Sequence, residues 1–433
     1  MNLLRFVKIG IRYLTIIICA VGFISLPVLS SASGRYGLPL IKAEKAGMST
    51  ERLARIKNTM LGFVTARELP NAVTTVARNG KIVHFETVGY MDVEKSIPVK
   101  ADTIFRLHSQ TKPVTGVAAM MLFEEGLFSL DDPIAKYLPE FSDMQVLLEN
   151  KDGAEVLVKA DPITIRQLML HTSGISSGRY ANERLAQKHK NSAPTYLRVG
   201  ITSEEYIKRL TEIPLSAQPG SKWIYGASTS VLSRLVEVLS SQRFGEFCKQ
   251  RIFEPLGMND TDFHVPATKV HRLASLYIEQ PDGTYLLADV NTIDGDYGKR
   301  PSLELGASGL AGTIADYMRF AQMLANGGEL DGVRLLSPST VGLIMANHLP
   351  EKLIGSFAKG EGHGLTVSVV VDHVAAGKAS PNGQFGWGGA AGTTFSIDPE
   401  NNIVSMVFTQ VLYSSSAYRH RFNQMVYQAL IEE

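Results

Sequence analysis

The sequence has little cysteine and no concentrated positive charge. Lysine and arginine total 43 against 42 aspartate and glutamate, a net charge of +1, and no run of five or more basic residues occurs. Nucleic acid is therefore not an expected partner, because its binding requires a basic surface. The ten histidines show no His-Glu-x-x-His spacing and the two cysteines, Cys19 and Cys248, are far apart, so no metal or cofactor is expected.

The composition is that of a globular enzyme. The 433 residues are 45% hydrophobic and 20% charged, with no internal repeat and no low-complexity segment. These proportions exclude disorder and coiled coil. The length suits two or three domains, or one enzyme with two lobes.

The segment 1–32 differs from the rest of the chain. Three basic residues precede an apolar run at 13–29, and small residues follow it. This order is typical of a secretory signal, and we expect cleavage after Ala32. The protein is then exported, to the periplasm or beyond, as a domain of residues 33–433 with Cys248 as its one cysteine.

An uncleaved membrane anchor is the alternative interpretation of this segment. The apolar run contains Pro27, and its length is at the short limit for spanning a bilayer. Cys19 follows Ile18, where a lipoprotein signal requires a small residue, so lipidation is the minor option. The one expected membrane contact is through this segment.

Strand patterns occur near both ends of the chain. Four such runs are found, in two pairs, at 72–77, 81–88, 392–398 and 403–410. Asn79-Gly80 joins the first pair and predicts a β-hairpin. Apolar residues at helical spacing begin near Thr50, which we expect to cap a helix, and an amphipathic helix at 415–433 closes the chain.

The region 106–266 is mostly helical by its apolar periodicity. Helical spacing is found at 113–125, 163–170, 203–211 and 228–240. Beyond it, Thr313 and Asp316 suggest a capping box, and Ser337-Pro338 suggests another helix start. We therefore expect an α/β fold of the α+β type. An antiparallel sheet from about 45–105 and 303–433 is flanked by helices and carries an inserted helical lobe at about 106–302.

Ser109 and Lys112 are the first candidates for chemistry. They stand three apart at the expected start of a helix, so their side chains share a face. A serine hydroxyl needs a base to become a nucleophile, and a lysine serves as that base only where its pKa is depressed. The helix start adds backbone N–H groups that stabilise an oxyanion.

Three motifs carry a resemblance to a known family. Positions 105–116 read Phe-Arg-Leu-His-Ser-Gln-Thr-Lys-Pro-Val-Thr-Gly. This segment resembles the nucleophile segment of the serine β-lactamase and penicillin-binding-protein superfamily, above all class C β-lactamases and family VIII carboxylesterases. The second motif, at 218–227, reads Gln-Pro-Gly-Ser-Lys-Trp-Ile-Tyr-Gly-Ala, and the third, at 385–392, reads Phe-Gly-Trp-Gly-Gly-Ala-Ala-Gly. The resemblance covers roughly residues 45–431 and implies the β-lactamase/transpeptidase-like fold.

The resemblance also implies the role of each site residue. Ser109 attacks the carbonyl carbon, while Lys112 and Tyr225 share the proton transfers, and either of them is the base. The backbone N–H groups of Ser109 and Ala390 form the oxyanion hole, and water hydrolyses the acyl-enzyme. The substrate-binding positions are Trp387, Gly388 and Gly389.

Two departures from the β-lactamase pattern change the expected substrate. Ala227 stands where class C β-lactamases carry asparagine, and Trp387 stands where they carry lysine. A lysine there presents a cation to a substrate carboxylate, whereas tryptophan presents an apolar plane and one N–H. We therefore expect an exported carboxylesterase for short-chain neutral esters, with weak β-lactam hydrolysis as an addition.

Other interpretations remain open. A β-lactamase or D-amino-acid-specific peptidase is the alternative enzyme, and a penicillin-recognising protein without turnover is the alternative outside enzymes. Gly-Ile-Ser-Ser-Gly at 174–178 matches the α/β-hydrolase nucleophile elbow, with Ser176 as nucleophile, but a helical pattern precedes it where that elbow requires a strand. His171 is interpreted as a structural residue that anchors a loop.

Overall fold

The computed structural model describes residues 35–149, 152–178, 183–192, 200–290, 295–356 and 358–431. The predicted secretory signal lies outside these residues. Residues Ser33–Glu433 form one compact unit, and no helix among the described residues is long and apolar enough to cross a membrane.

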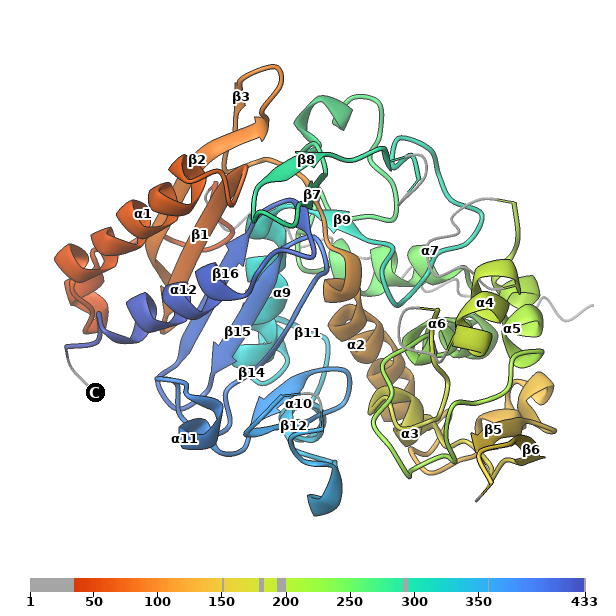
Figure 1. Ribbon diagram of the computed structural model, residues 1–433. Coiled ribbons are helices and arrows are strands. Elements are labelled where there is room, and N and C mark those ends of the chain that lie inside the picture. Colours follow the sequence, from red (N-terminus) through yellow and green to blue (C-terminus); the bar gives the residue numbers. More distant parts are fainter. Residues whose placement is uncertain are drawn as a thin grey trace, which may run out of the picture. The chain divides into compact units, whose positions relative to one another are not determined.

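An antiparallel sheet of eight strands is the centre of this unit (Figure 1). Its order is β12 (Glu361–His363), β13 (Ser368–Val370), β14 (Phe385–Gly388), β15 (Thr394–Asp398), β16 (Ile403–Phe408), β1 (Asn71–Arg78), β2 (Lys81–Asp92) and β3 (Ile97–Pro98). The two ends of the chain meet where β1 pairs with β16, with Val73 opposite Phe408. The predicted antiparallel sheet from both chain ends is therefore confirmed.

Helices cover both faces of the sheet. On one face lie α1 (Thr50–Thr65) and α12 (Ala417–Tyr427), which pack against each other, and on the other lies α9 (Ile314–Ala325) (Figure 1). Strand β1 is buried along its whole length, with alternate residues such as Ala72 and Val73 entering the two separate apolar clusters. This alternation follows from the period of two of a strand.

The helical lobe is built around α2 and α6, which pack together. Its helices are α2 (Thr111–Glu124), α3 (Ile165–Met169), α4 (Glu183–Ser192), α5 (Ser203–Thr211), α6 (Ser228–Ser240) and α7 (Phe244–Cys248). Two further helices, α10 (Pro338–Met345) and α11 (His373–Ala376), lie before and after the strands β12 and β13 along the chain. Ser337 caps α10 as expected, since its Oγ accepts a hydrogen bond from Thr340 N–H.

Small strand pairs complete the unit. They are β4 (Phe105–Arg106) with β9 (Ala311–Gly312), β5 (Gln145–Glu149) with β6 (Glu155–Lys159), β10 (Glu329–Leu330) with β11 (Val333–Arg334), and β17 (Val411–Leu412) with β7 (Tyr277–Glu279) and β8 (Tyr285–Leu287). The β5–β6 hairpin lies in the region that was predicted to be mostly helical, and the β7–β8 hairpin lies in the remaining part of the predicted lobe at 106–302. The sequence pattern did not identify these short strands, because runs of so few residues fit the period of a helix as well as that of a strand.

Two capping predictions need correction. The cap of α1 is Ser49, whose Oγ accepts from Arg52 N–H, whereas Thr50 is the first helical residue and donates to Glu44. Thr313 does cap α9 through Asp316 N–H, but Asp316 does not complete a capping box. Its carboxylate instead accepts from the backbone N–H of Asp260 and the hydroxyl of Thr261.

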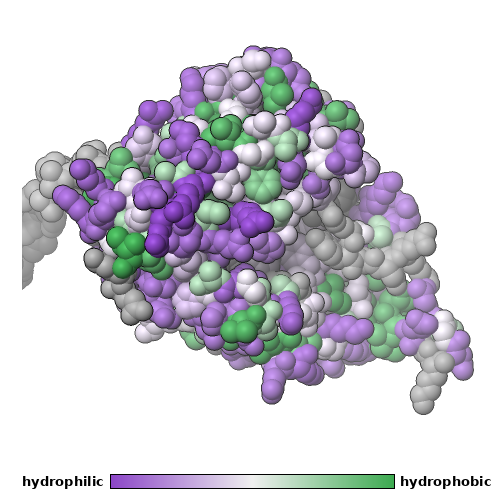
Figure 2. Space-filling model, turned by 60° about the vertical axis from the view of Figure 1, so that its left-hand side comes forward, coloured by the Kyte–Doolittle hydropathy of each residue, from purple (hydrophilic) through white to green (hydrophobic). Residues whose placement is uncertain are grey.

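The surface of the α1 and α12 side is mostly hydrophilic (Figure 2). Apolar residues on this face form small separate patches (Figure 2). Scattered apolar residues are ordinary on a protein surface. The candidate functional sites are therefore the clefts of the molecule.

Candidate active site

The segment that carries Ser109 is held between the sheet lobe and the helical lobe. Strand β4 pairs with β9 and leads into a short 3₁₀ turn, His108–Gln110, from which α2 starts at Thr111. His108 has φ +45°, in the left-handed region. A non-glycine residue is strained there, and such strain concentrates at functional sites.

Lys112 lies in the first turn of α2 with its side chain in the protein interior. The residue is 2% exposed, and its Nζ donates a hydrogen bond to the carbonyl oxygen of Ala307 at 2.8 Å. Burial lowers the pKa of Lys112 to about 7, because removal from water disfavours the charged amine. A neutral amine, which accepts a proton, is therefore well populated at neutral pH.

Tyr225 lies directly beside this amine. Lys112 Nζ is 4.6 Å from the centroid of the Tyr225 ring. Burial is the largest effect on the pKa of the Tyr225 phenol and raises it to about 12, while hydrogen bonds with the side chains of Ser109 and Trp387 act in the opposite direction. Lysine, tyrosine and serine are thus brought into one group, as the resemblance implied.

The third motif forms the opposite wall. Trp387 lies on β14, opposite Phe395 of β15. Gly389, the residue after β14, lies close to the nucleophile segment. A Cβ on Gly389 would lie 2.2 Å from the Leu107 carbonyl oxygen. Glycine is therefore required for this approach.

The predicted oxyanion donors are available for a ligand. Ser109 N–H and Ala390 N–H donate no hydrogen bond to another group among the described residues. Ala390 is fixed by its own carbonyl, which accepts from Tyr413 N–H at 3.0 Å. Free backbone donors beside a nucleophile are what stabilisation of an oxyanion requires.

Aromatic rings surround the group. The ring of His171 is 4.7 Å from that of Tyr225, and His363 is 5.3 Å from Trp387, measured between ring centroids. Trp223 stacks at 5.8 Å on Tyr225. Burial lowers the pKa of His363 to about 4 and that of His171 well below its usual value. Both imidazoles are therefore neutral, and these walls of the site are uncharged.

Sequence reasoning missed two of these residues. Trp223 stands two positions before Tyr225 in the second motif, so its proximity was open to prediction. His363 belongs to no motif, and nothing local indicated it. His171 agrees with its predicted anchoring role, because its carbonyl accepts from Ile224 N–H at 2.7 Å, immediately before Tyr225.

A cleft of about 890 Å³ opens above these residues. Six of the predicted residues line it, namely Ser109, Tyr225, Trp387, Gly388, Gly389 and Ala390. Lys112 does not line this cleft and is buried in the first turn of α2. The volume is that of a site for a drug-sized molecule.

Ser176, the alternative nucleophile, lies in a closed environment. It is 1% exposed, and its Oγ is 3.0 Å from Nε2 of His189 beside a cavity of about 10 Å³. Helix α3 precedes it, not a strand. The loop has a structural use, since a Cβ on Gly226 would lie 2.4 Å from the Ile175 carbonyl oxygen. The loop therefore packs directly against Gly226, the residue after Tyr225.

Among the described residues, no group of three or more histidine, cysteine, aspartate or glutamate side chains is arranged to hold a metal ion.

Comparison with known proteins agrees with this geometry. The family model described as Beta-lactamase matches residues 56–428. The chain belongs to the β-lactamase family. Within this family it is 30% identical to Esterase EstB of Burkholderia gladioli, over 80% of this chain and 87% of that protein. It is 33% identical to Protein Rv1367c of Mycobacterium tuberculosis, over 79% of this chain and 86% of that protein.

A solved structure of the same kind is that of EstCE1, described as a hydrolase with promiscuous acyltransferase activity. It superposes with a TM-score of 0.74 at 25% identity and covers 87% of this chain and 99% of EstCE1. The predicted membership of the serine β-lactamase-like esterase superfamily and the predicted fold are both confirmed.

Proposed function

We propose that this β-lactamase-family protein is an exported serine carboxylesterase for short-chain neutral esters. The observation that carries the proposal is the cleft in which Ser109, Tyr225 and a buried Lys112 of low pKa meet under an uncharged aromatic wall. The similarity to Esterase EstB supports the class of substrate. Export rests on the pattern of the segment 1–32 alone.

The proposed reaction begins at Ser109. Neutral Lys112, with a pKa of about 7, takes the serine proton as Oγ attacks the carbonyl carbon, directly or through the phenol of Tyr225. The developing oxyanion lies between the N–H groups of Ser109 and Ala390. Because the Tyr225 pKa is about 12, its phenol stays protonated at neutral pH and donates a proton to the departing alkoxide, and the Lys112 ammonium then returns its proton to the phenolate. Water then attacks the acyl-enzyme with the same groups as base.

Trp387 is the proposed determinant of substrate charge. A penicillin or cephalosporin carries a carboxylate near its reactive carbonyl, and no cation stands at Trp387 to receive it. A charge-assisted hydrogen bond contributes about 1.5–3 kcal/mol, which is roughly ten- to a hundred-fold in kcat/KM. Neutral short esters avoid this loss and pack against the indole.

The test compares p-nitrophenyl esters of rising acyl length with a penicillin and a chromogenic cephalosporin. We expect wild-type kcat/KM for short esters to exceed that for penicillins by at least ten-fold. Trp387→Lys should shift the ratio toward β-lactams by roughly ten-fold or more. Trp387→Phe is the matched control, since it keeps an aromatic wall without adding a cation, and should leave the ratio within a few-fold.

Equal rates on penicillins and esters in the wild type would instead support the β-lactamase alternative. A persistent adduct detected by mass spectrometry, without turnover of either substrate, would support the penicillin-recognising alternative. Intact Ser109, Lys112 and Tyr225 argue against this last outcome.

A further inference from the structure

The predicted oxyanion donor Ala390 lies in a tight turn between β14 and β15, formed by residues 389–392 and called here the oxyanion turn. Within the turn, Gly392 N–H donates to the Gly389 carbonyl at 3.0 Å, and Gly389 N–H donates to the Thr393 carbonyl at 2.7 Å. Ala390 N–H takes part in neither bond. The direction of this N–H therefore depends on how the whole turn is held.

Three carbonyls of the oxyanion turn accept hydrogen bonds from outside it. Those of Ala390 and Ala391 accept, at 3.0 and 2.9 Å, from backbone N–H groups at 411–413. The carbonyl of Gly392 accepts instead from a side chain, the hydroxyl of Tyr418 on α12, at 2.9 Å. Of these three bonds, the one from Tyr418 is therefore the one that depends on the identity of a side chain.

Gly392 is the position in the turn where an external bond has most effect. Its φ is +98°, in the region that favours glycine, and a glycine backbone is the least restricted of any residue. A Cβ on Gly392 would lie 2.3 Å from Cγ2 of Thr409 and 3.1 Å from the hydroxyl oxygen of Tyr418. The hydroxyl thus packs directly on the residue whose backbone it holds.

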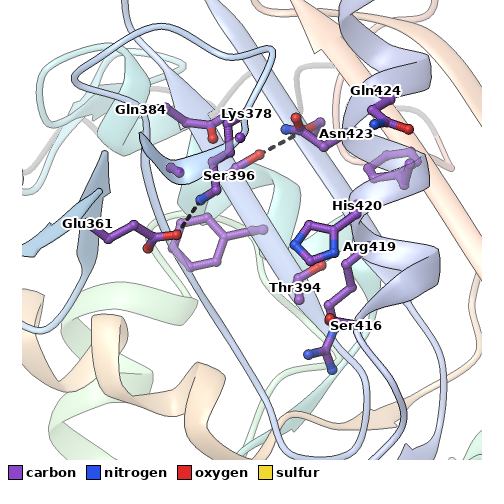
Figure 3. Close-up of a pocket in the computed structure, with 15 residues that line it drawn as sticks. Glu361, Lys378, Gln384, Thr394, Ser396, Ser416, Arg419, His420, Asn423 and Gln424 are labelled. Atoms are coloured by element: carbon purple, nitrogen blue, oxygen red, sulfur yellow. Dashed lines mark hydrogen bonds and ion pairs between the residues drawn. The ribbon is translucent and has the colours of Figure 1, made fainter. Parts of the chain in front are cut away.

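The surroundings of Tyr418 direct its hydroxyl proton to the turn. Its ring is buried in the apolar cluster that contains residues of α1 and α12, at 6.4 Å from the ring of Phe63. Its oxygen accepts from Nε of Arg419 at 2.9 Å, so the single phenol proton is left for the Gly392 carbonyl. Arg419 and Ser416 lie on the wall of the active-site cleft (Figure 3). The hydroxyl therefore joins this end of α12 to the oxyanion turn.

We propose that Tyr418 is a positioning residue for the oxyanion hole. By holding the Gly392 carbonyl, it fixes the turn so that Ala390 N–H is directed at the oxygen that becomes negative when Ser109 attacks. This inference rests on the proposed esterase function and adds a residue to it. Tyr418 does not line the cleft, so it acts through the turn and not on the substrate.

A misdirected donor should weaken the transition state more than the bound substrate, because the carbonyl oxygen becomes fully charged only after attack. Acylation and deacylation both pass through such an oxyanion. Loss of the Tyr418 hydroxyl should therefore lower kcat and leave KM nearly unchanged.

Tyr418→Phe is the variant that tests this expectation, since it keeps the ring in the apolar cluster and removes only the hydroxyl. We expect kcat on a short p-nitrophenyl ester to fall by about ten-fold. Complete removal of an oxyanion donor costs about a hundred- to a thousand-fold, and a donor that is displaced but present should cost less. KM should stay within about two-fold of the wild-type value.

A matched pair of inhibitors measures the oxyanion directly. Oγ of Ser109 adds to the carbonyl carbon of an aryl trifluoromethyl ketone, the carbonyl oxygen becomes the oxyanion, and the serine proton passes to the pair Lys112 and Tyr225. The corresponding methyl ketone has the same shape and binds without this addition. Tyr418→Phe should reduce the preference for the trifluoromethyl ketone, given by the ratio of the two inhibition constants, by about ten-fold. Binding of the methyl ketone should change little.

Tyr427→Phe is the matched control. Tyr427 lies on the same helix, its hydroxyl donates to the Asp398 carboxylate at 2.8 Å, and it does not line the cleft. This variant also loses one hydrogen bond of a phenol in α12, so its melting temperature should fall. Its kcat and its preference between the two ketones should stay at the wild-type values.

The possible negative results differ from one another. Absence of turnover on every ester by the wild type would overturn the proposed esterase function itself. Wild-type turnover together with an unchanged kcat and an unchanged ketone preference in Tyr418→Phe would overturn the role of Tyr418 alone. Equal weakening of both ketones, or the same change of preference in Tyr427→Phe, would also overturn it, because a general loss of structure does not distinguish an oxyanion from a neutral carbonyl.

Discussion

A single buried lysine sets the chemistry at the scale of residues. Lys112 loses its water shell and gains the Ala307 carbonyl, a hydrogen bond that satisfies the amine without adding negative charge. Burial alone accounts for its lowered pKa. Burial raises the pKa of Tyr225, which lies beside it. The two groups are therefore separated by several pKa units, which fits one as proton acceptor and the other as proton donor.

The pH dependence of both activity and stability follows from Lys112. Esterase kcat/KM should rise between about pH 6 and pH 8, as the amine loses its proton near its pKa of about 7.

The folded pKa of Lys112 is depressed below the unfolded value, so the unfolded chain binds more protons between pH 7 and 10. Stability should therefore rise over this window. Lys112→Met should raise the melting temperature more at pH 6 than at pH 10; an equal rise at both would contradict a depressed pKa.

Lys112 and Tyr225 are expected to act as a unit. The double variant Lys112→Met with Tyr225→Phe should lose little more activity than the poorer single variant, because each group needs the other to complete the proton transfers. The measurement is kcat/KM on one short p-nitrophenyl ester for all four proteins. Losses that multiply would show that the two residues have independent roles.

Ser109 and Ser176 provide a direct comparison of two serines. Ser109→Ala should reduce turnover by several orders of magnitude, roughly the loss on removal of a nucleophile that acts in a concerted group. Ser176→Ala should keep turnover within a few-fold, because that hydroxyl is buried against His189. Retention of more than about a tenth of the activity by Ser109→Ala would exclude it as the nucleophile.

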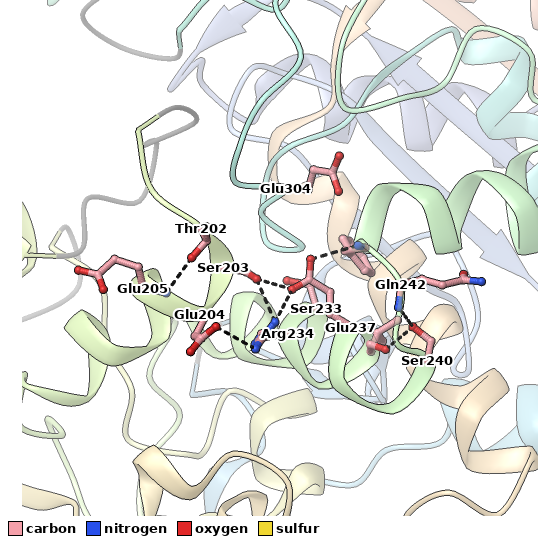
Figure 4. Close-up of polar contacts among 12 residues, drawn as sticks. Thr202, Ser203, Glu204, Glu205, Ser233, Arg234, Glu237, Ser240, Gln242 and Glu304 are labelled. Carbon is pink, nitrogen blue, oxygen red and sulfur yellow. Dashed lines mark hydrogen bonds and ion pairs between the residues drawn. The ribbon is translucent and has the colours of Figure 1, made fainter.

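At the scale of elements, polar contacts join helices α5, α6 and α7 of the helical lobe. Glu237 of α6 accepts hydrogen bonds from Ser203 of α5 and Arg234 of α6, and from the backbone N–H of Phe244 at the start of α7 (Figure 4). Its side chain is 12% exposed. One carboxylate thus connects three helices, including α6, which begins three residues after Tyr225.

Loss of this carboxylate should destabilise the lobe. We expect Glu237→Ala to lower the free energy of unfolding by about 1–3 kcal/mol, since it leaves partly buried donors unpaired. Glu204→Ala is the control: Glu204 contacts the same Arg234 at 3.9 Å but is 72% exposed, and the expected loss is below about 0.5 kcal/mol. Chemical denaturation of the two variants measures the difference, and equal losses would refute the role of Glu237.

At the scale of the whole molecule, the two ends of the chain build one sheet. The β1–β16 pairing joins residues more than 300 positions apart, and α1 packs against α12 on the same face. The folded hydrolase therefore needs both ends of its domain to be present before the sheet is complete.

Cleavage after Ala32 is the prediction at this scale. N-terminal sequencing or intact-mass measurement of protein from the periplasm or medium should give Ser33 as the first residue. Ala32→Pro is expected to block processing, because signal peptidases require a small residue there. Recovery of full-length protein in the membrane fraction would support the uncleaved anchor.

The sequence by itself determined the local features. The Ser109–Lys112 spacing, the Tyr225 and Trp387 motifs and the Asn79-Gly80 hairpin are short patterns whose meaning depends on neighbours along the chain. Periodicity also located α5 and α6 at their observed bounds. The short hairpins within the helical lobe were missed, since too few residues define their period.

Tertiary structure decided the properties that depend on distant parts of the chain. The low pKa of Lys112 requires burial by segments far along the chain, such as that of Ala307, and the ring of His363 reaches Trp387 from another strand. The active-site cleft is lined by residues of β14, β15 and α12 that no sequence pattern connects. Burial, electrostatic environment and cavity shape arise from packing between segments, and for this reason they become visible when the chain is folded.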